Sequence, residues 1–216
     1  MKKIFVLSGI LAALLVNPAA AQNAPPISAE SKALLEAYIS SDGYRTFAED
    51  VFNRIEPLPQ RANCPHMTIS GNTNLYTPLT NVSVIGESPN RLVANGAWIS
   101  AVDFDRCGKK VRRRALMKAD DKGTILPVRL LPGNFRGNLN LERDAMRIAG
   151  AALMASAGCA DGKLFFVTDV TSTEIKPNGE WTELWTASAC GKEVTTDVSY
   201  GVVPDGIVVS ANAHKP

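Results

Sequence analysis

Apolar side chains recur every three or four residues in three stretches of the chain, which is the spacing of a helix with one buried face. The stretches are residues 29–39, 44–55 and 141–153. Pro57 follows the second stretch and ends it, because proline lacks the backbone N–H group that continues a helix. Asn140 suits the N-cap of the third helix, and Gly158 suits its C-terminal cap. The pattern predicts two helices early in the chain and one in its second half.

Strict alternation of apolar and polar residues predicts strands with one buried face. Alternation is clearest at residues 194–202, after which residues 204–206 form a turn and residues 207–211 a returning strand. Residues 111–117 and the turn at residues 120–123 repeat this arrangement in the first half of the chain. Further strands are expected at residues 97–106, 124–131 and 181–189.

Two segments of the chain align when Cys107 is set over Cys190, an offset of 83 residues. The aligned triplets are Gly96-Ala97-Trp98 with Gly179-Glu180-Trp181, and Cys107-Gly108-Lys109 with Cys190-Gly191-Lys192. Six of the sixteen positions from Gly96 to Val111 are identical, where average residue usage gives about one. The sequence therefore predicts an internal repeat, in which each copy runs from helix through a cysteine into strands.

The repeat predicts an α+β fold of two similar units, each with helix and antiparallel strands and each stapled by a disulfide. We place the units at residues 22–133 and 134–216, and leave open whether they pack as one domain. Four cysteines allow three pairings. The order of cysteines in the two copies selects Cys64 with Cys107, and Cys159 with Cys190. Both bonds have a stabilising role.

The first copy carries 12 extra residues, because Cys64 and Trp98 lie 34 positions apart while Cys159 and Trp181 lie only 22 apart. We assign the extra residues to the polar segment Ser70–Asn90. Loops on a rigid scaffold commonly carry function, so this segment is a candidate binding loop. The alternative is a surface insertion that is merely tolerated.

The second copy contains Trp181-x-Glu183-x-Trp185, followed by Cys190-Gly191-Lys192 and a hairpin. This pattern resembles a segment of uncharacterised secreted proteins of Gram-negative bacteria, over about thirty residues. The resemblance implies a periplasmic location and nothing about activity. The first copy departs from the pattern.

The chain begins with the features of a secretory signal peptide. Lys2 and Lys3 precede a short apolar run that Pro18 ends, and small residues follow, so we expect cleavage between Ala21 and Gln22. The run is too short to span a bilayer. We therefore expect residues 1–21 to be removed and the rest to be soluble in the periplasm or secreted. The alternative is an uncleaved anchor.

Charge and cysteine content limit the kinds of partner and ligand that the chain is expected to bind. Without Lys2 and Lys3 the chain has 21 basic and 21 acidic residues, which argues against attraction of the whole protein to nucleic acid or to an anionic membrane. An even number of cysteines in an exported chain predicts two disulfides. No pair has the C-x-x-C spacing of a zinc site, and only His66 and His214 are available as histidine ligands.

No catalytic, cofactor-binding or metal-binding residue is predicted. Cys64-Pro65-His66-Met67 has methionine where the redox C-x-x-C motif has its second cysteine. We therefore predict a binding or protein-interaction module that is not an enzyme and uses no cofactor. The alternative is an envelope hydrolase or a redox accessory enzyme that uses His66 or a carboxylate. The oligomeric state stays open.

Two clusters are candidate binding sites. Alternation along one strand places Trp181, Glu183 and Trp185 on the same face, where they form either an aromatic pocket or the edge of the core. Alternation along another strand places Arg112, Arg114 and Lys118 on the face opposite Val111. These cations form a candidate strip for an anionic envelope component or protein. The alternative for the strip is solvated charge that discourages aggregation.

Overall fold

A computed structural model describes residues 15–16, 26–86 and 92–213, and the chain divides into two compact units between Asn134 and Phe135. We call residues 26–86 and 92–134 the N-terminal unit, and residues 15–16 and 135–213 the C-terminal unit. None of the helices in these residues is long and apolar enough to cross a membrane. The expected signal peptide lies outside the described residues except for residues 15–16.

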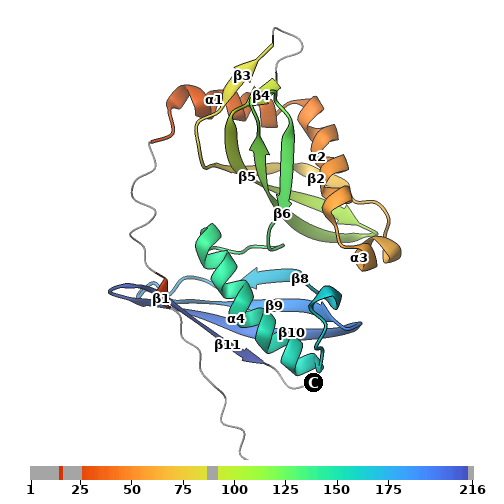
Figure 1. Cartoon of the computed structure of the whole chain (residues 1–216), viewed down its shortest axis with the longest axis vertical. Helices are drawn as coiled ribbons and strands as arrows, with labels where there is room; N and C mark the ends of the chain where they lie inside the picture. Colours follow the sequence, from red (N-terminus) through yellow and green to blue (C-terminus); the bar gives the residue numbers. More distant parts are fainter. Residues whose placement is uncertain (1–14, 17–25, 87–91, 214–216) are drawn as a thin grey trace, which may run out of the picture. The chain divides into compact units, whose positions relative to one another are not determined.

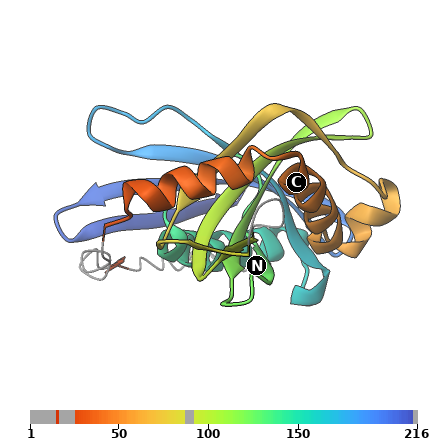
Figure 2. The same cartoon turned by 90° about the horizontal axis from the view of Figure 1, so that it is seen from above.

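The N-terminal unit begins with three helices, α1 (Ala29–Ile39), α2 (Asp42–Ile55) and α3 (Leu58–Asn63). Ser28 and Ser41 cap the first two, each accepting a backbone N–H hydrogen bond at 3.1 Å through its side chain. In Figure 2, α1 lies lengthwise and α2 is seen nearly end-on, so the two helices run in different directions. The prediction for the first helix is confirmed at both ends.

The strands of this unit form an antiparallel sheet in the order β2-β5-β6-β7. The strands are β2 (Thr68–Pro78), β5 (Gly96–Arg106), β6 (Lys109–Ala119) and β7 (Ile125–Arg129), and a separate pair consists of β3 (Ser83–Ile85) and β4 (Leu92–Ala94). The segment Ser70–Asn90 is therefore not a simple loop, since most of it is β2 and β3 (Figure 1). Residues 87–90 lie outside the described part.

Aromatic contacts between α2 and the sheet hold the core of the N-terminal unit together. Phe52 packs on Phe104 with ring centroids 5.3 Å apart. Trp98 is fully buried nearby in β5. The hydroxyl of Tyr44 donates a hydrogen bond to Oγ of Ser100 at 2.7 Å, so both buried hydroxyl groups are satisfied. One face of α2 is thereby fixed on the sheet, and its opposite face remains available.

The C-terminal unit has one long helix before its sheet. Its elements are α4 (Leu139–Ala157), the 3₁₀ turn η2 (Gly162–Leu164), and the strands β8 (Phe165–Ser172), β9 (Trp181–Ala189), β10 (Lys192–Val203) and β11 (Gly206–Ala213). A two-residue strand, β1 (Leu15–Val16), pairs with β11 and completes the order β1-β11-β10-β9-β8. Figure 1 shows α4 lying across this sheet.

Both ends of α4 carry caps. Gly158 has the left-handed conformation that a C-terminal cap requires (φ 64°), as predicted. The N-cap is Asn138 rather than Asn140. The side chain of Asn138 accepts a hydrogen bond from the N–H of Leu141 at 2.9 Å, whereas Asn140 already lies inside the first turn.

The two predicted disulfides are confirmed as Cys64–Cys107 and Cys159–Cys190. Each joins the segment that follows a helix to the turn between two long strands of the same unit. Cys107 and Gly108 both have positive φ (49° and 80°), as do Cys190 and Gly191 (50° and 77°). Two consecutive residues with positive φ are characteristic of the type I′ turn, whose twist matches that of the flanking strands. The turn geometry explains why glycine follows cysteine in both units.

We expect loss of the second disulfide to destabilise the C-terminal unit. In the variant Cys159→Ser/Cys190→Ser, the 31-residue separation between the two positions is no longer closed by a covalent bond. The denatured chain then gains entropy, and the free energy of unfolding should fall by about 3 kcal/mol. Urea unfolding followed by the emission of Trp181 and Trp185 measures this loss, and an unchanged midpoint would contradict it.

Candidate functional site

A groove of about 530 Å³ lies beside α2 in the N-terminal unit. One wall is the solvent-facing side of α2, where polar side chains recur at helical spacing. The opposite wall is Arg61 of α3 and the segment that leads into β2. We call this hollow the α2–β2 groove, and its lining residues are Thr46, Glu49, Asp50, Asn53, Arg54, Arg61, Pro65, His66, Met67 and Thr68.

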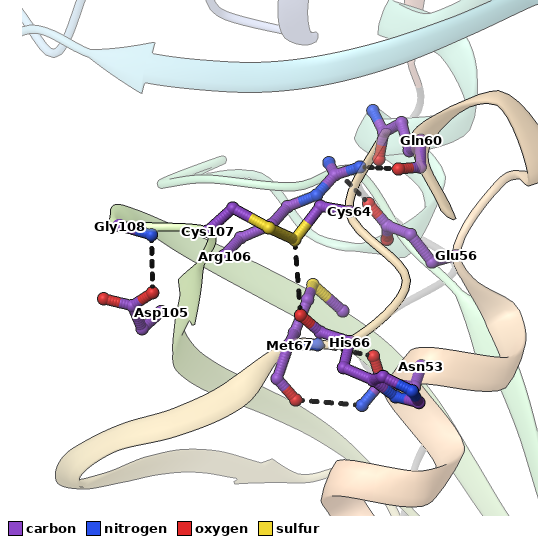
Figure 3. Close-up of a disulfide and its surroundings, with 10 residues drawn as sticks. All are labelled: Asn53, Glu56, Gln60, Cys64, His66, Met67, Asp105, Arg106, Cys107 and Gly108. Carbon is purple, nitrogen blue, oxygen red and sulfur yellow. Dashed lines mark hydrogen bonds and ion pairs between the residues drawn. A yellow bond between two sulfur atoms is a disulfide. The ribbon is translucent and has the colours of Figure 1, made fainter. Parts of the chain in front are cut away.

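Asn53 fixes the two walls of the groove to one another. Its side-chain amide donates to the carbonyl of Met67 at 2.9 Å, and its side-chain oxygen accepts from the N–H of Met67 at 2.8 Å. The amide also donates to the carbonyl of Glu49 at 2.8 Å. Met67 is buried, and Figure 3 shows its backbone beside the side chain of Asn53. The groove is therefore a preformed feature whose floor is hydrogen-bonded.

The Cys64–Cys107 disulfide holds the next residues along the chain (Figure 3). Sγ of Cys64 lies 3.3 Å from the carbonyl oxygen of His66. Pro65 and His66 are exposed at the rim, whereas Cys64 is buried. The disulfide therefore holds His66, the histidine on which the alternative enzymatic prediction rests, beside the groove.

Charges of both signs line the groove. Asp50 and Arg54 pair with each other at 3.0 Å, and both side chains are 64% exposed, so the pair is weak. Arg61 differs, because its buried Nε has no hydrogen-bond partner among the described residues. A buried N–H without an acceptor is costly, while the rest of the Arg61 side chain lines the groove. Together with Arg61, the carboxylate of Glu49 and the ring of His66 allow the groove to hydrogen-bond both the donors and the acceptors of a ligand.

A buried ion cluster lies beneath this region, around Glu56. Arg113 donates to the carboxylate from Nη2 at 2.8 Å and from Nε at 3.1 Å, and Arg106 donates from Nη1 at 3.2 Å. The side chains of Glu56 and Arg113 are only 3% and 5% exposed. Gln60 completes the cluster, since its side-chain oxygen accepts from Arg113. Its carbonyl accepts from Arg106, as Figure 3 shows. Burial lowers the pKa of Arg106, and the Glu56 carboxylate opposes this shift.

The predicted aromatic pocket of the C-terminal unit is an internal cluster. Trp181, Glu183 and Trp185 do share one face of β9, but all three are buried, and Glu183 is fully buried. Both indole N–H groups donate to Glu183, Trp181 at 3.3 Å and Trp185 at 2.9 Å. The expectation of an open pocket is therefore corrected, because the rings and the carboxylate satisfy one another inside the core.

Three further donors surround Glu183. They are the hydroxyl of Tyr200 at 2.8 Å, the hydroxyl of Ser172 at 3.0 Å and the backbone N–H of Arg136 at 3.2 Å. Tyr200 also stacks on Trp181, with ring centroids 4.4 Å apart. Burial, followed by the Glu183 carboxylate, raises the pKa of Tyr200 far above its usual value. A buried carboxylate with this many donors organises the core.

The predicted cationic strip on β6 also needs correction. Arg112 forms a two-point ion pair with Asp103, at 2.6 and 2.8 Å, and donates to Asn134 at 2.7 Å. Arg114 is buried, and its Nη1 donates to the carbonyl of Leu131 at 3.3 Å. Of the three cations, Lys118 is the exposed one. Strand alternation placed these residues on one face, but it did not reveal that two of them have internal partners.

Sequence reasoning named His66 but missed the other members of the groove. The polar face of α2, with Glu49 and Asn53 four residues apart, was the available signal. Arg61 carried no signal, because its place beside the groove depends on how the short helix α3 follows α2. Among the described residues, no group of three or more His, Cys, Asp or Glu side chains is placed to hold a metal ion.

Two disulfides are typical of proteins that fold in an oxidising compartment outside the cytoplasm. Comparison with known proteins does not assign the chain to a family. The chain matches no family model, and no curated protein or solved structure shows significant similarity to it.

Proposed function

We propose that this chain is an exported, periplasmic or secreted binding module whose α2–β2 groove takes a polar ligand or a loop of a partner protein. The observation that carries the proposal is the groove itself, whose two walls Asn53 ties together and whose lining brings Arg61, Glu49 and His66 into one hollow. A partner that brings an acceptor to Arg61 and a donor to Glu49 gains charge-assisted hydrogen bonds there.

The same proposal includes an origin by duplication. In both units a helix leads to a cysteine and then to four strands of an antiparallel sheet, with a Cys-Gly turn between the second and third of these strands. The six identities around these turns support common descent. Before its cysteine the C-terminal unit has α4 alone, whereas the N-terminal unit has three helices. The groove-forming helices α2 and α3 are thus a specialisation of the first unit.

Capture from envelope extract tests the groove directly. The protein without residues 1–21 is immobilised with its disulfides intact, beside the variants Arg61→Ala and Glu49→Gln. Each variant removes one charged hydrogen-bonding group, so recovery of the bound partner should fall about tenfold. Arg147→Ala and Glu174→Gln are the matched controls, since both residues are exposed in the other unit. Equal recovery by all five proteins would reject the groove as the binding site.

The alternative class, an envelope hydrolase or redox accessory enzyme, rests on His66. Replacing His66 with Ala distinguishes the two classes, because the residue is exposed and the fold should not depend on it. In a binding module this substitution changes at most the affinity, because there is no catalytic turnover. Loss of an envelope activity, with folding and partner capture both unchanged, would replace the binding proposal with the enzymatic one.

A further inference from the structure

An open sheet has two edge strands, and exposed edges invite pairing with other chains unless they are protected. With the two-residue strand β1 set aside, the edges of the two large sheets are β2, β7, β8 and β11, and the first three of these carry a protective feature. In the N-terminal unit, β7 contains Pro127, which has no backbone N–H group to pair. The other edge, β2, has a register shift between Ile69 and Asn74, and Arg45 donates to the carbonyl of Ile69 at 3.3 Å.

In the C-terminal unit, the edge strand β8 has features that hinder pairing with another chain, whereas the described residues of β11 have none. At β8 the register shifts between Val167 and Asp169, and Asp169 adds an exposed charge. At β11 the pairing with β10 runs without a shift over eight residue pairs, from Thr196 with Ala213 to Val203 with Gly206. The sequence of β11, Gly-Ile-Val-Val-Ser-Ala-Asn-Ala, has no charge and no proline. This edge is suited to accept another strand.

The structure shows a strand at this edge. Leu15 and Val16 pair antiparallel with Val208 and Ile207. These two residues belong to the segment that we expect to be cleaved after Ala21. In the exported form the edge of β11 therefore loses its partner strand, and its backbone groups become available.

We infer that β11 of the exported protein pairs antiparallel with β11 of a second copy, joining two C-terminal units into one continuous sheet. A twofold axis perpendicular to the sheet sets a strand antiparallel to itself, which is the orientation that β1 has at this edge. Near the axis each residue faces its own copy or a close neighbour in the sequence, so a charge there would lie beside its like and repel. The uncharged sequence of β11 removes that obstacle.

The same axis places the core-facing sides of the two C-terminal sheets on the same side of the joined sheet. Val209 of β11 points into the core and is 1% exposed, and α4 packs on the strand. Val208 lies on the opposite face, where Gly201 is its neighbour on β10. A substitution at Val208 therefore alters the edge and spares the core.

The test uses protein purified from the periplasm, with its first residue verified by mass. Sedimentation should show a dimer that dissociates on dilution. Val208→Lys should weaken the dimer about tenfold or more, because it sets two cations close together across the axis. Val128→Lys is the matched control, an exposed valine on the proline-protected edge β7, and should leave the dimer intact. Circular dichroism and thermal melting verify that each variant is folded.

A peptide with the sequence of residues 11–17, Leu-Ala-Ala-Leu-Leu-Val-Asn, provides a second measurement that needs no substitution. It should compete for the edge and convert the dimer to a monomer. A processed protein that sediments as a monomer overturns the inference, as does a dimer that survives both Val208→Lys and the peptide. A monomer that binds the peptide would assign the edge to an extended peptide of another protein, which also overturns the second copy as its partner.

Discussion

Glu183→Ala should lower the free energy of unfolding of the C-terminal unit by about 5 kcal/mol. The substitution removes the acceptor of five hydrogen bonds, among them those of Trp185 and Tyr200, and leaves the donors buried. The loss is comparable to the whole stability of many domains. Glu183→Gln keeps the shape and one acceptor oxygen, so its loss should be smaller.

Urea unfolding in a Trp98→Phe background measures this effect. The three tryptophans of the chain are then reduced to Trp181 and Trp185, which both contact Glu183. Glu193→Ala is the matched control, because Glu193 is an exposed glutamate on the neighbouring strand, and it should change stability by less than about 0.5 kcal/mol. If the two alanine variants unfold at the same urea concentration, Glu183 does not organise this core.

Glu56→Ala should destabilise the N-terminal unit by about 4 kcal/mol. The substitution takes away the carboxylate that Arg113 and Arg106 face, while Arg113 stays almost fully buried. A buried cation that loses its counter-ion bears the full cost of desolvation. Glu56→Gln keeps the shape and part of the hydrogen bonding, so the difference between the two variants isolates the contribution of charge.

The emission of Trp98 reports on this unit during unfolding, in a background with Trp181→Phe and Trp185→Phe. Asp50→Ala is the matched control, since it removes an ion pair whose side chains are 64% exposed, and it should cost less than about 1 kcal/mol. A loss no larger than that of the control would show that the Glu56 cluster does not stabilise the fold.

Local patterns predicted the elements whose buried face repeats regularly. The first helix and the strand Trp181–Ala189 were predicted to the residue, because alternation and helical spacing record which face is buried. The segment Ser70–Pro78 was expected to be loop and is strand β2. Its residues are mostly polar, and its pairing with β5 is a long-range contact that no local pattern reveals.

The candidate site was harder to predict because its members come together only in the fold, where Asn53 joins Met67 across 14 residues of chain. The buried ion cluster was equally hidden, because Glu56 and Arg113 are 57 residues apart and nothing local connects them. Strand alternation correctly assigned the face of β9 on which Glu183 lies, but it does not tell how deeply a side chain on that face is buried. The sequence analysis expected the Glu183 carboxylate near the surface, because charged residues are usually exposed. It did not identify the hydrogen-bond donors that β8 and β10 bring to this carboxylate.

The disulfides join consecutive cysteines, and under the export proposed above this pattern bears on how the chain oxidises. A chain that crosses the membrane from its N-terminus presents Cys64 and Cys107 before Cys159 and Cys190. An oxidant that joins thiols as they arrive therefore makes the native pairs directly, each within its own folding unit. Maturation of this protein should depend on a thiol oxidase, while a disulfide isomerase has no wrong pairs to correct.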